Sequence, residues 1–116
     1  MTFHINSRLT WFVTTLILTT LGTSFVHADV ISEAAKIGAN AGAMEYCEEQ
    51  IASKDDRSKY KLLSISTYKE FDDLDSSDKT KALIYRKAAE DGDYLGDPLD
   101  EERCDSLRKM LYLKYN

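Results

Sequence analysis

The sequence contains few of the side chains on which most catalytic and metal sites depend. Its two histidines, His4 and His27, and its only tryptophan, Trp11, all lie within the first 28 residues. Nucleophilic catalysis normally needs a histidine or another general base, and zinc sites need histidine or free thiolates. Once the first 28 residues are removed, the chain has no imidazole for either purpose. We therefore expect a protein that is not an enzyme, with no catalytic residues and no cofactor.

The N-terminal segment also lacks charge. An uncharged run over 9–26 follows Arg8, and Val26-His27-Ala28 closes it. A basic start, an apolar stretch and small residues before the cut are typical of a cleavable signal peptide. We predict a signal peptide over 1–28 and an exported helical domain over 29–116, either periplasmic or secreted. The alternative is an uncleaved membrane anchor, because the run is long enough to cross about 30 Å of hydrocarbon.

The part of the chain after the predicted cut lacks an excess of basic residues. All 20 acidic residues and 14 of the 15 basic residues lie after Ala28, which gives this part a formal net charge of −6. Nucleic acids and anionic lipid surfaces both attract basic proteins. We therefore expect no nucleic-acid partner, no membrane contact after cleavage, and another protein as the partner. An acidic domain of this size could also inhibit a basic enzyme by docking on it.

Only two cysteines are present, Cys47 and Cys104, and they form no CxxC motif. An even number of cysteines in an exported chain indicates disulfide bonding, and two cysteines allow one intramolecular pairing. We predict a Cys47–Cys104 disulfide, which would stabilise the fold by about 4 kcal/mol through loop closure. An intermolecular bond or a redox pair is the alternative.

The predicted mature sequence has one proline, Pro98, and its apolar spacing is mostly helical. We predict helices over 31–52, 58–73, 78–91 and about 100–114. Gly38 and Gly42 lie one turn apart in the first of these and would let another helix approach closely. Gly92 is expected to end the third helix in a left-handed conformation, and 92–98 to form a loop. The predicted fold class is all-α: a small single domain of about four helices, joined by one disulfide.

Each later helix shows one apolar face. The predicted buried residues are Tyr60, Leu63, Thr67, Phe71 and Leu74 in the second helix, Ala82, Tyr85 and Ala89 in the third, and Cys104, Leu107 and Leu111, widened by Met110 and Leu113, in the fourth. The start of the third helix, Asp75-Ser76-Ser77-Asp78, predicts a hydroxyl cap followed by an acid. Most tyrosines are expected in the core, whereas Tyr112 and Tyr115 are candidates for an exposed interface.

An acidic stretch over 90–105 contains a single basic residue, Arg103. Calcium takes oxygen ligands from acidic loops, and part of the stretch follows the EF-hand spacing. The candidate ligands are Asp91, Asp93, Asp97 and Glu102. Leu95 occupies a position at which an EF-hand needs an oxygen, and Pro98 follows in the same loop. A small calcium-binding module is thus one alternative, and a solvated loop whose acids cap the fourth helix is the other.

Around its first cysteine the chain reads Tyr46-Cys47-Glu48-Glu49, and a second predicted helix surrounds Cys104. With its signal peptide and helical content, the sequence resembles in outline the acid-activated periplasmic chaperones of the HdeA type. The resemblance implies an acid-triggered chaperone, because protonating every carboxylate would change the net charge from −6 to about +14. The leading hypothesis is a non-enzymatic envelope protein that binds another protein or stabilises an assembly.

Overall fold

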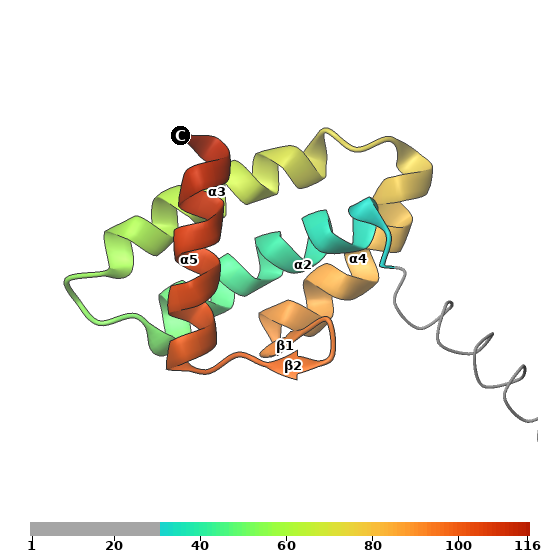
Figure 1. Cartoon of the computed structure of the whole chain (residues 1–116). Coiled ribbons are helices and arrows are strands. Elements are labelled where there is room, and N and C mark those ends of the chain that lie inside the picture. The colour runs from blue at the N-terminus through green and yellow to red at the C-terminus, as the bar shows by residue number, and fades with distance from the viewer. Residues whose placement is uncertain (1–30) are drawn as a thin grey trace, which may run out of the picture. The chain divides into compact units, whose positions relative to one another are not determined.

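The computed structural model describes residues 31–116, so the predicted signal peptide lies outside the described residues. Four α-helices form the domain: α2 (Glu33–Tyr46), α3 (Arg57–Asp72), α4 (Ser76–Glu90) and α5 (Glu101–Tyr115). Between α4 and α5, the short strands β1 (Asp93–Tyr94) and β2 (Asp97–Pro98) pair in antiparallel orientation. Figure 1 shows α2 between α3 and α4. The C-terminal half of α5 crosses α3. The prediction of an all-α domain with four helices is confirmed.

Three of the four helices begin with a side-chain cap, in which an oxygen accepts a hydrogen bond from the backbone N–H three residues on. The capping residues are Ser32, Asp75 and Asp100, at 3.2, 2.9 and 2.8 Å. At the third helix the sequence predicted a hydroxyl cap. The carboxylate of Asp75 takes that role instead, because α4 begins at Ser76, earlier than expected. Asp56, which precedes α3, makes no side-chain cap bond.

The first helix changes its winding in its last turns. The predicted single helix over 31–52 is an α-helix as far as Tyr46 and continues as a π-helix, η1 (Cys47–Ile51). At its end the N–H of Ala52 donates to the carbonyl of Cys47 at 2.7 Å, which is the i to i+5 bond of that helix type. The disulfide-bonded Cys47 is the first residue of this wider segment.

The disulfide joins the end of the first helix to the start of the last. Cys47 and Cys104 are fully buried and bonded, with their Cα atoms 5.8 Å apart and a separation of 57 in sequence. The predicted pairing is confirmed. Because Cys47 begins η1 and Cys104 lies in the first turn of α5, the bond fixes α5 to the central helix.

The contact between α2 and α4 is built from small residues, and we call it the α2–α4 seam (Gly38 and Gly42 against Ala82, Arg86 and Ala89). A Cβ atom added at Gly38 would overlap the carbonyl oxygen of Ala82. One added at Gly42 would overlap the carbonyl oxygen of Arg86. The predicted close approach is confirmed, and it accounts for two residues that each disfavour a helix by about 1 kcal/mol relative to alanine.

The predicted apolar faces are mostly buried, with three exposed exceptions and one residue, Leu74, that is half-buried beyond the end of α3. Tyr60, Leu63, Thr67 and Phe71 are all buried along α3, as are Ala82 and Ala89 on α4 and Cys104, Leu107 and Leu111 on α5. Tyr85, Met110 and Leu113 were predicted to join these faces but are exposed. Tyr85 lies about 60° around α4 from Ala82, beside the narrow seam. Met110 and Leu113 are exposed on α5, outside its buried row of Cys104, Leu107 and Leu111.

The segment predicted as a loop over 92–98 contains a hairpin. Gly92 has a φ of +100°, as expected for its cap role, and Leu95 and Gly96 follow with φ values of 50° and 96°. Two consecutive left-handed residues fit the tight turn of a two-residue hairpin, although leucine is unusual there. The buried Tyr94 anchors the hairpin, since its hydroxyl donates to Oδ1 of Asn40 on α2 at 2.7 Å.

Candidate functional site

A hollow with a mostly apolar lining lies between α3 and α5, and we call it the α3–α5 groove. It has a volume of about 500 Å³. Its lining residues are Lys59, Leu62, Leu63, Ile65 and Ser66 of α3, and Arg108, Tyr112, Tyr115 and Asn116 from the end of the chain. Leu63 on α3 is buried, whereas Leu62 and Ile65 beside it remain exposed, and all three line the groove.

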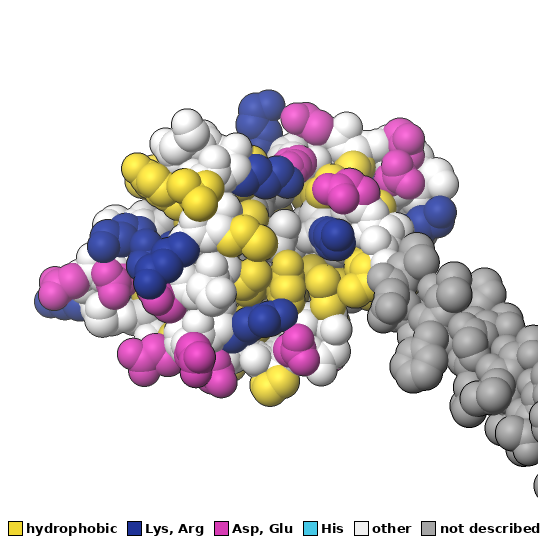
Figure 2. All heavy atoms as spheres, viewed as in Figure 1, with side chains coloured by type: hydrophobic (Ala, Val, Ile, Leu, Met, Phe, Trp, Pro, Cys, Tyr) yellow, Lys and Arg dark blue, Asp and Glu magenta, His cyan; other side chains and the backbone are white. Residues whose placement is uncertain are grey.

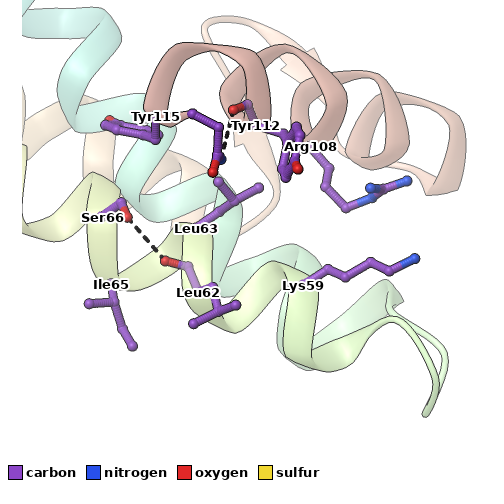
Figure 3. A pocket seen from close by; sticks show the side chains of 9 residues that line it. Lys59, Leu62, Leu63, Ile65, Ser66, Arg108, Tyr112 and Tyr115 are labelled. Carbon is purple, nitrogen blue, oxygen red and sulfur yellow. Dashed lines mark hydrogen bonds between the residues drawn. The ribbon is translucent and has the colours of Figure 1, made fainter.

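Large apolar side chains remain exposed along the groove. Leu62 is 67% exposed, Ile65 60% and Tyr112 57%, whereas Leu63 beside them is buried. In Figure 3 Leu63 points from α3 toward α5. Scattered apolar residues are ordinary on a protein surface, but several gathered at one hollow indicate a contact surface. The groove is therefore a candidate binding surface.

The end of the groove nearest the start of α3 is basic. Lys59 and Arg108 extend to the same end in Figure 3. Lys59 pairs with Asp56 at 3.3 Å, and Arg108 pairs with Asp105 at 2.8 Å and lies over the Tyr60 ring at 5.9 Å. Hydrogen bonds from Lys109 and Arg108 hold the pKa of Asp105 below its usual value. The carboxylates lie outside the groove lining, so its charged members are both cations.

The other end of the groove is closed by contacts from the C-terminus to α3. Lys114 pairs with Glu70 at 2.9 Å, and the Tyr115 hydroxyl donates to the same carboxylate at 3.3 Å. Burial, with the negative charge of Glu70, raises the pKa of Tyr115 to about 12. Tyr115 is therefore neutral at physiological pH and acts as a hydrogen-bond donor that holds α5 on α3.

A second hollow with the opposite charge adjoins the start of α5, and we call it the acidic hollow. It measures about 530 Å³ and is lined by Ile51, Ala52, Ser53, Asp56, Tyr60, Glu101, Glu102 and Asp105. In Figure 2 acidic side chains gather where α5 begins, and basic and apolar side chains lie further along it. Inhibition of a basic enzyme stays a prediction, and this hollow is the surface on which such an enzyme would dock.

The four candidate calcium ligands have separate local roles. Asp91 ends α4, and Asp93 accepts a hydrogen bond from the N–H of Gly96 at 3.0 Å. Asp97 pairs with Arg103 at 3.1 Å, and Glu102 lies in the first turn of α5. Within residues 31–116 no group of three or more histidine, cysteine, aspartate or glutamate side chains is placed to hold a metal ion. The structure therefore does not bring the four candidates together as one site.

A cluster of polar side chains joins α2, α3 and α4 away from the groove. The Tyr68 hydroxyl donates to Glu45 at 2.5 Å and lies 3.2 Å from a carboxylate oxygen of Glu90. Burial and the two carboxylates raise the pKa of Tyr68 well above its usual value. Arg86 pairs with Glu90 at 3.6 Å and lies over the Phe71 ring at 4.8 Å. The cluster links three helices through hydrogen bonds and an ion pair.

The sequence did not single out the groove. Leu62 and Ile65 fall outside the predicted buried face of α3, so the prediction assigned these two apolar residues neither to the core nor to a contact surface. These two unassigned apolar residues were the signal available in the sequence. Tyr112 was a further one, since it was predicted as a candidate for an exposed interface and is exposed. The pairing of α3 with α5, which the groove requires, follows from tertiary packing and leaves no local pattern.

No helix within residues 31–116 combines the length and the apolar character that crossing a bilayer requires. A buried disulfide in this part of the chain is compatible with an exported protein, because such bonds persist in oxidising compartments. Comparison of the chain with protein-family models, curated proteins and solved structures found no significant match.

Proposed function

We propose that the domain is a non-enzymatic, exported protein-binding module and that the α3–α5 groove is its binding surface. The observation that carries the proposal is the exposure of Leu62, Ile65 and Tyr112 around one hollow of a small, highly charged domain. Protein interfaces gain most of their free energy from a few large apolar or aromatic anchors in desolvated pockets. Tyrosine suits such a surface because its ring is apolar and its tip polar.

The framework around the groove also supports a binding role. The disulfide holds α5 against the central helix, and Lys114 and Tyr115 hold its end on α3. A surface that is ordered before it meets its partner loses less conformational entropy on binding. A groove between two fixed helices is therefore better suited to recognition than a flexible tail would be.

Site-specific photo-crosslinking in the native envelope at neutral pH tests this proposal. A photoreactive residue in place of Ile65 should form an adduct with a partner protein, whereas one in place of Ile84 should not. Ile84 is the matched control, because it is exposed to a similar extent, 69% against 60%, but lies on α4 outside the groove. Equal adducts at both positions, or none at position 65, would contradict the proposal.

An acid-activated chaperone is the second candidate, and the cluster around Tyr68 favours it. Glu45 and Glu90 come from α2 and α4 and both meet Tyr68 of α3. Protonation of these carboxylates would remove the ion pair of Glu90 with Arg86 and weaken the contact between three helices. The discriminating experiment is prevention of aggregation of a denatured client. A chaperone of this kind protects the client only below about pH 4, where carboxylates titrate, whereas the groove proposal requires binding at neutral pH.

A further inference from the structure

The helices that form the α3–α5 groove carry a local basic charge in an acidic protein. From Arg57 to Lys69, α3 contains four basic residues and no acid. From Arg108 to the end of the chain there are three basic residues and again no acid. The net charge of the whole chain is −5, so these two stretches differ in sign from the chain as a whole.

Two of the four basic residues of α3, Arg57 and Lys59, are placed against the helix dipole. The N-terminal end of a helix carries a partial positive charge, and a cation in the first turn is disfavoured there. Nevertheless α3 has no acid in its first turn, contains Arg57 and Lys59 there, and lacks a side-chain cap from Asp56. The other three described helices each have an acid in the first turn. The charge of α3 is thus not explained by the stability of its own helix.

The cations near the groove are available to a partner to different degrees. Lys61 has no ion pair among the described residues and is exposed. Lys59 pairs with Asp56, but both side chains are about half exposed, so a partner carboxylate could replace Asp56 at little cost. The Arg108 side chain is only 19% exposed and is held by Asp105. Lys61 does not line the groove, so Lys59 is the cation best placed to meet an incoming anion there.

The apolar residues follow Lys59 along α3. Leu62 and Ile65 come within the next two turns and line the same groove, and Tyr112 lines it from α5. A partner that fills this surface must present apolar side chains beside acidic ones. An amphipathic helix satisfies this requirement, because residues three and four apart share one face.

We infer that the α3–α5 groove binds an acidic amphipathic helix of another protein, with apolar side chains on Leu62, Ile65 and Tyr112 and a carboxylate on Lys59. This inference rests on the proposed function and adds the chemistry of the partner. Complementary charge would set the orientation of the bound helix and increase its rate of association. The acidic hollow beside the groove would repel the carboxylates of such a helix, so the bound helix would stay over the groove and not extend across the hollow.

The test uses the oxidised, exported protein and a pair of synthetic amphipathic peptides with the same leucine face. One peptide carries glutamate on the flanking positions and the other carries lysine. Amide chemical shifts of the labelled protein at neutral pH and low salt locate the binding site and give the affinity. The acidic peptide should shift signals of α3 and α5 and bind on the order of tenfold or more tightly than the basic one. Added salt should reduce this preference.

Two substitutions sharpen the test. Lys59→Glu should remove or reverse the preference for the acidic peptide. Lys87→Glu on α4 is the matched control, because Lys87 is exposed, makes no ion pair among the described residues, and lies outside the groove lining. The control variant should retain the preference of the original protein. An equal effect of both substitutions would overturn the inference, since it would reflect net charge alone.

Other outcomes separate the inference from the proposed function. Equal binding of both peptides in the groove would overturn the acidic partner but support the groove as a binding surface. Failure of both peptides, with binding to phosphatidylglycerol vesicles that Lys59→Glu abolishes, would overturn both in favour of a lipid surface. Self-association measured by sedimentation and abolished by Ile65→Ser would identify a second copy of the chain as the occupant, and it would overturn the inference.

Discussion

The α2–α4 seam and the α3–α5 groove show two ways in which a pair of helices can meet in one small domain. At the seam, Gly38 and Gly42 leave no room between the helices for even one further carbon atom. At the groove, α3 and α5 leave a hollow of about 500 Å³ that is bordered by exposed Leu62, Ile65 and Tyr112. The seam therefore has no room for a ligand, whereas the groove has apolar side chains exposed to solvent.

The difference follows from the size of the residues and from what surrounds each helix. α2 lies inside the domain, and small side chains allow its neighbours to approach it on several sides. α5 is covered on one side only, so its large side chains are divided between a buried row and an exposed one. Stability should therefore depend on the seam and its covalent link, and binding on the groove.

Among the changes considered, removal of the disulfide should have the largest effect on stability. The double substitution Cys47→Ala and Cys104→Ala is expected to lower the free energy of unfolding by about 4 kcal/mol, because a 57-residue separation no longer restricts the unfolded chain. Denaturant unfolding measures the loss. Hydrogen exchange should accelerate more in α5 than in α2 and α4, because α5 loses its bond to η1 while the seam remains. A uniform acceleration in all four helices would show that seam and groove form one cooperative unit.

The adjacent residues Leu63 and Leu62 allow a matched comparison at the groove. Leu63→Ala should destabilise the protein by about 2–5 kcal/mol, because it creates a cavity beneath the groove. Leu62→Ala should change stability by less than about 0.5 kcal/mol, because its side chain is already exposed. Thermal or chemical unfolding of the two variants gives both values. Similar losses would mean that Leu62 is packed and the groove is closed in solution.

Gly38→Ala tests the seam. Alanine favours a helix over glycine by about 1 kcal/mol, so an open position would gain stability from this change. At Gly38 the added carbon meets the Ala82 backbone, and we expect a net loss of about 1–3 kcal/mol from overpacking. The sign of the change in the unfolding midpoint is the readout. A rise in stability would show that the helices separate easily and that the seam is not tight.

The smallest predicted effect is a shift in the ionisation of Tyr115 at the closed end of the groove. The pKa of this tyrosine is raised to about 12, so the folded protein holds its proton more tightly than the unfolded chain does. The stabilisation is complete below the ordinary tyrosine pKa of about 10 and is lost as the pH rises through about 12. Absorbance at alkaline pH, taken as the difference between the original protein and Tyr115→Phe, follows this one residue.

Glu70→Gln should lower the pKa of Tyr115 toward its ordinary value, because it removes the neighbouring negative charge. Glu102→Gln serves as a control at a distance, since this residue lies in the first turn of α5 and makes no contact with Tyr115. An unchanged titration in Glu70→Gln would show that burial alone raises the pKa. The end of the groove would then not depend on Glu70.

The helices and the disulfide were predictable because each leaves a local or pairwise signal. The three-to-four spacing of Tyr60, Leu63, Thr67 and Phe71 identified the buried face of α3. Two cysteines allowed only one intramolecular bond, which is the one that forms. The pair Gly38 and Gly42 indicated a close contact before the partner helix was known. In each case the residues that carry the signal lie close in sequence or have a single possible partner.

The remaining features depend on tertiary structure. The π-helix at Cys47–Ile51 and the hairpin turn at Leu95 have no distinct composition, and a leucine in a left-handed turn runs against local preference. Tyr85 has the spacing of a buried residue but lies beside a contact too narrow to cover it. The groove arises from surplus apolar residues on two helices whose pairing cannot be read from either one.

The bond between Cys47 and Cys104 also bears on how long the molecule survives in a protease-rich compartment. The segment between the two cysteines contains α3, α4 and the hairpin, and therefore most of the exposed turns. A single peptide bond cut within that segment leaves two fragments that are still joined covalently. The nicked protein would keep its mass apart from one added water and would separate into two pieces only under reducing conditions. One wall of the groove, α5, would thus stay attached to the central helix after a cut that would release it from an unbridged chain.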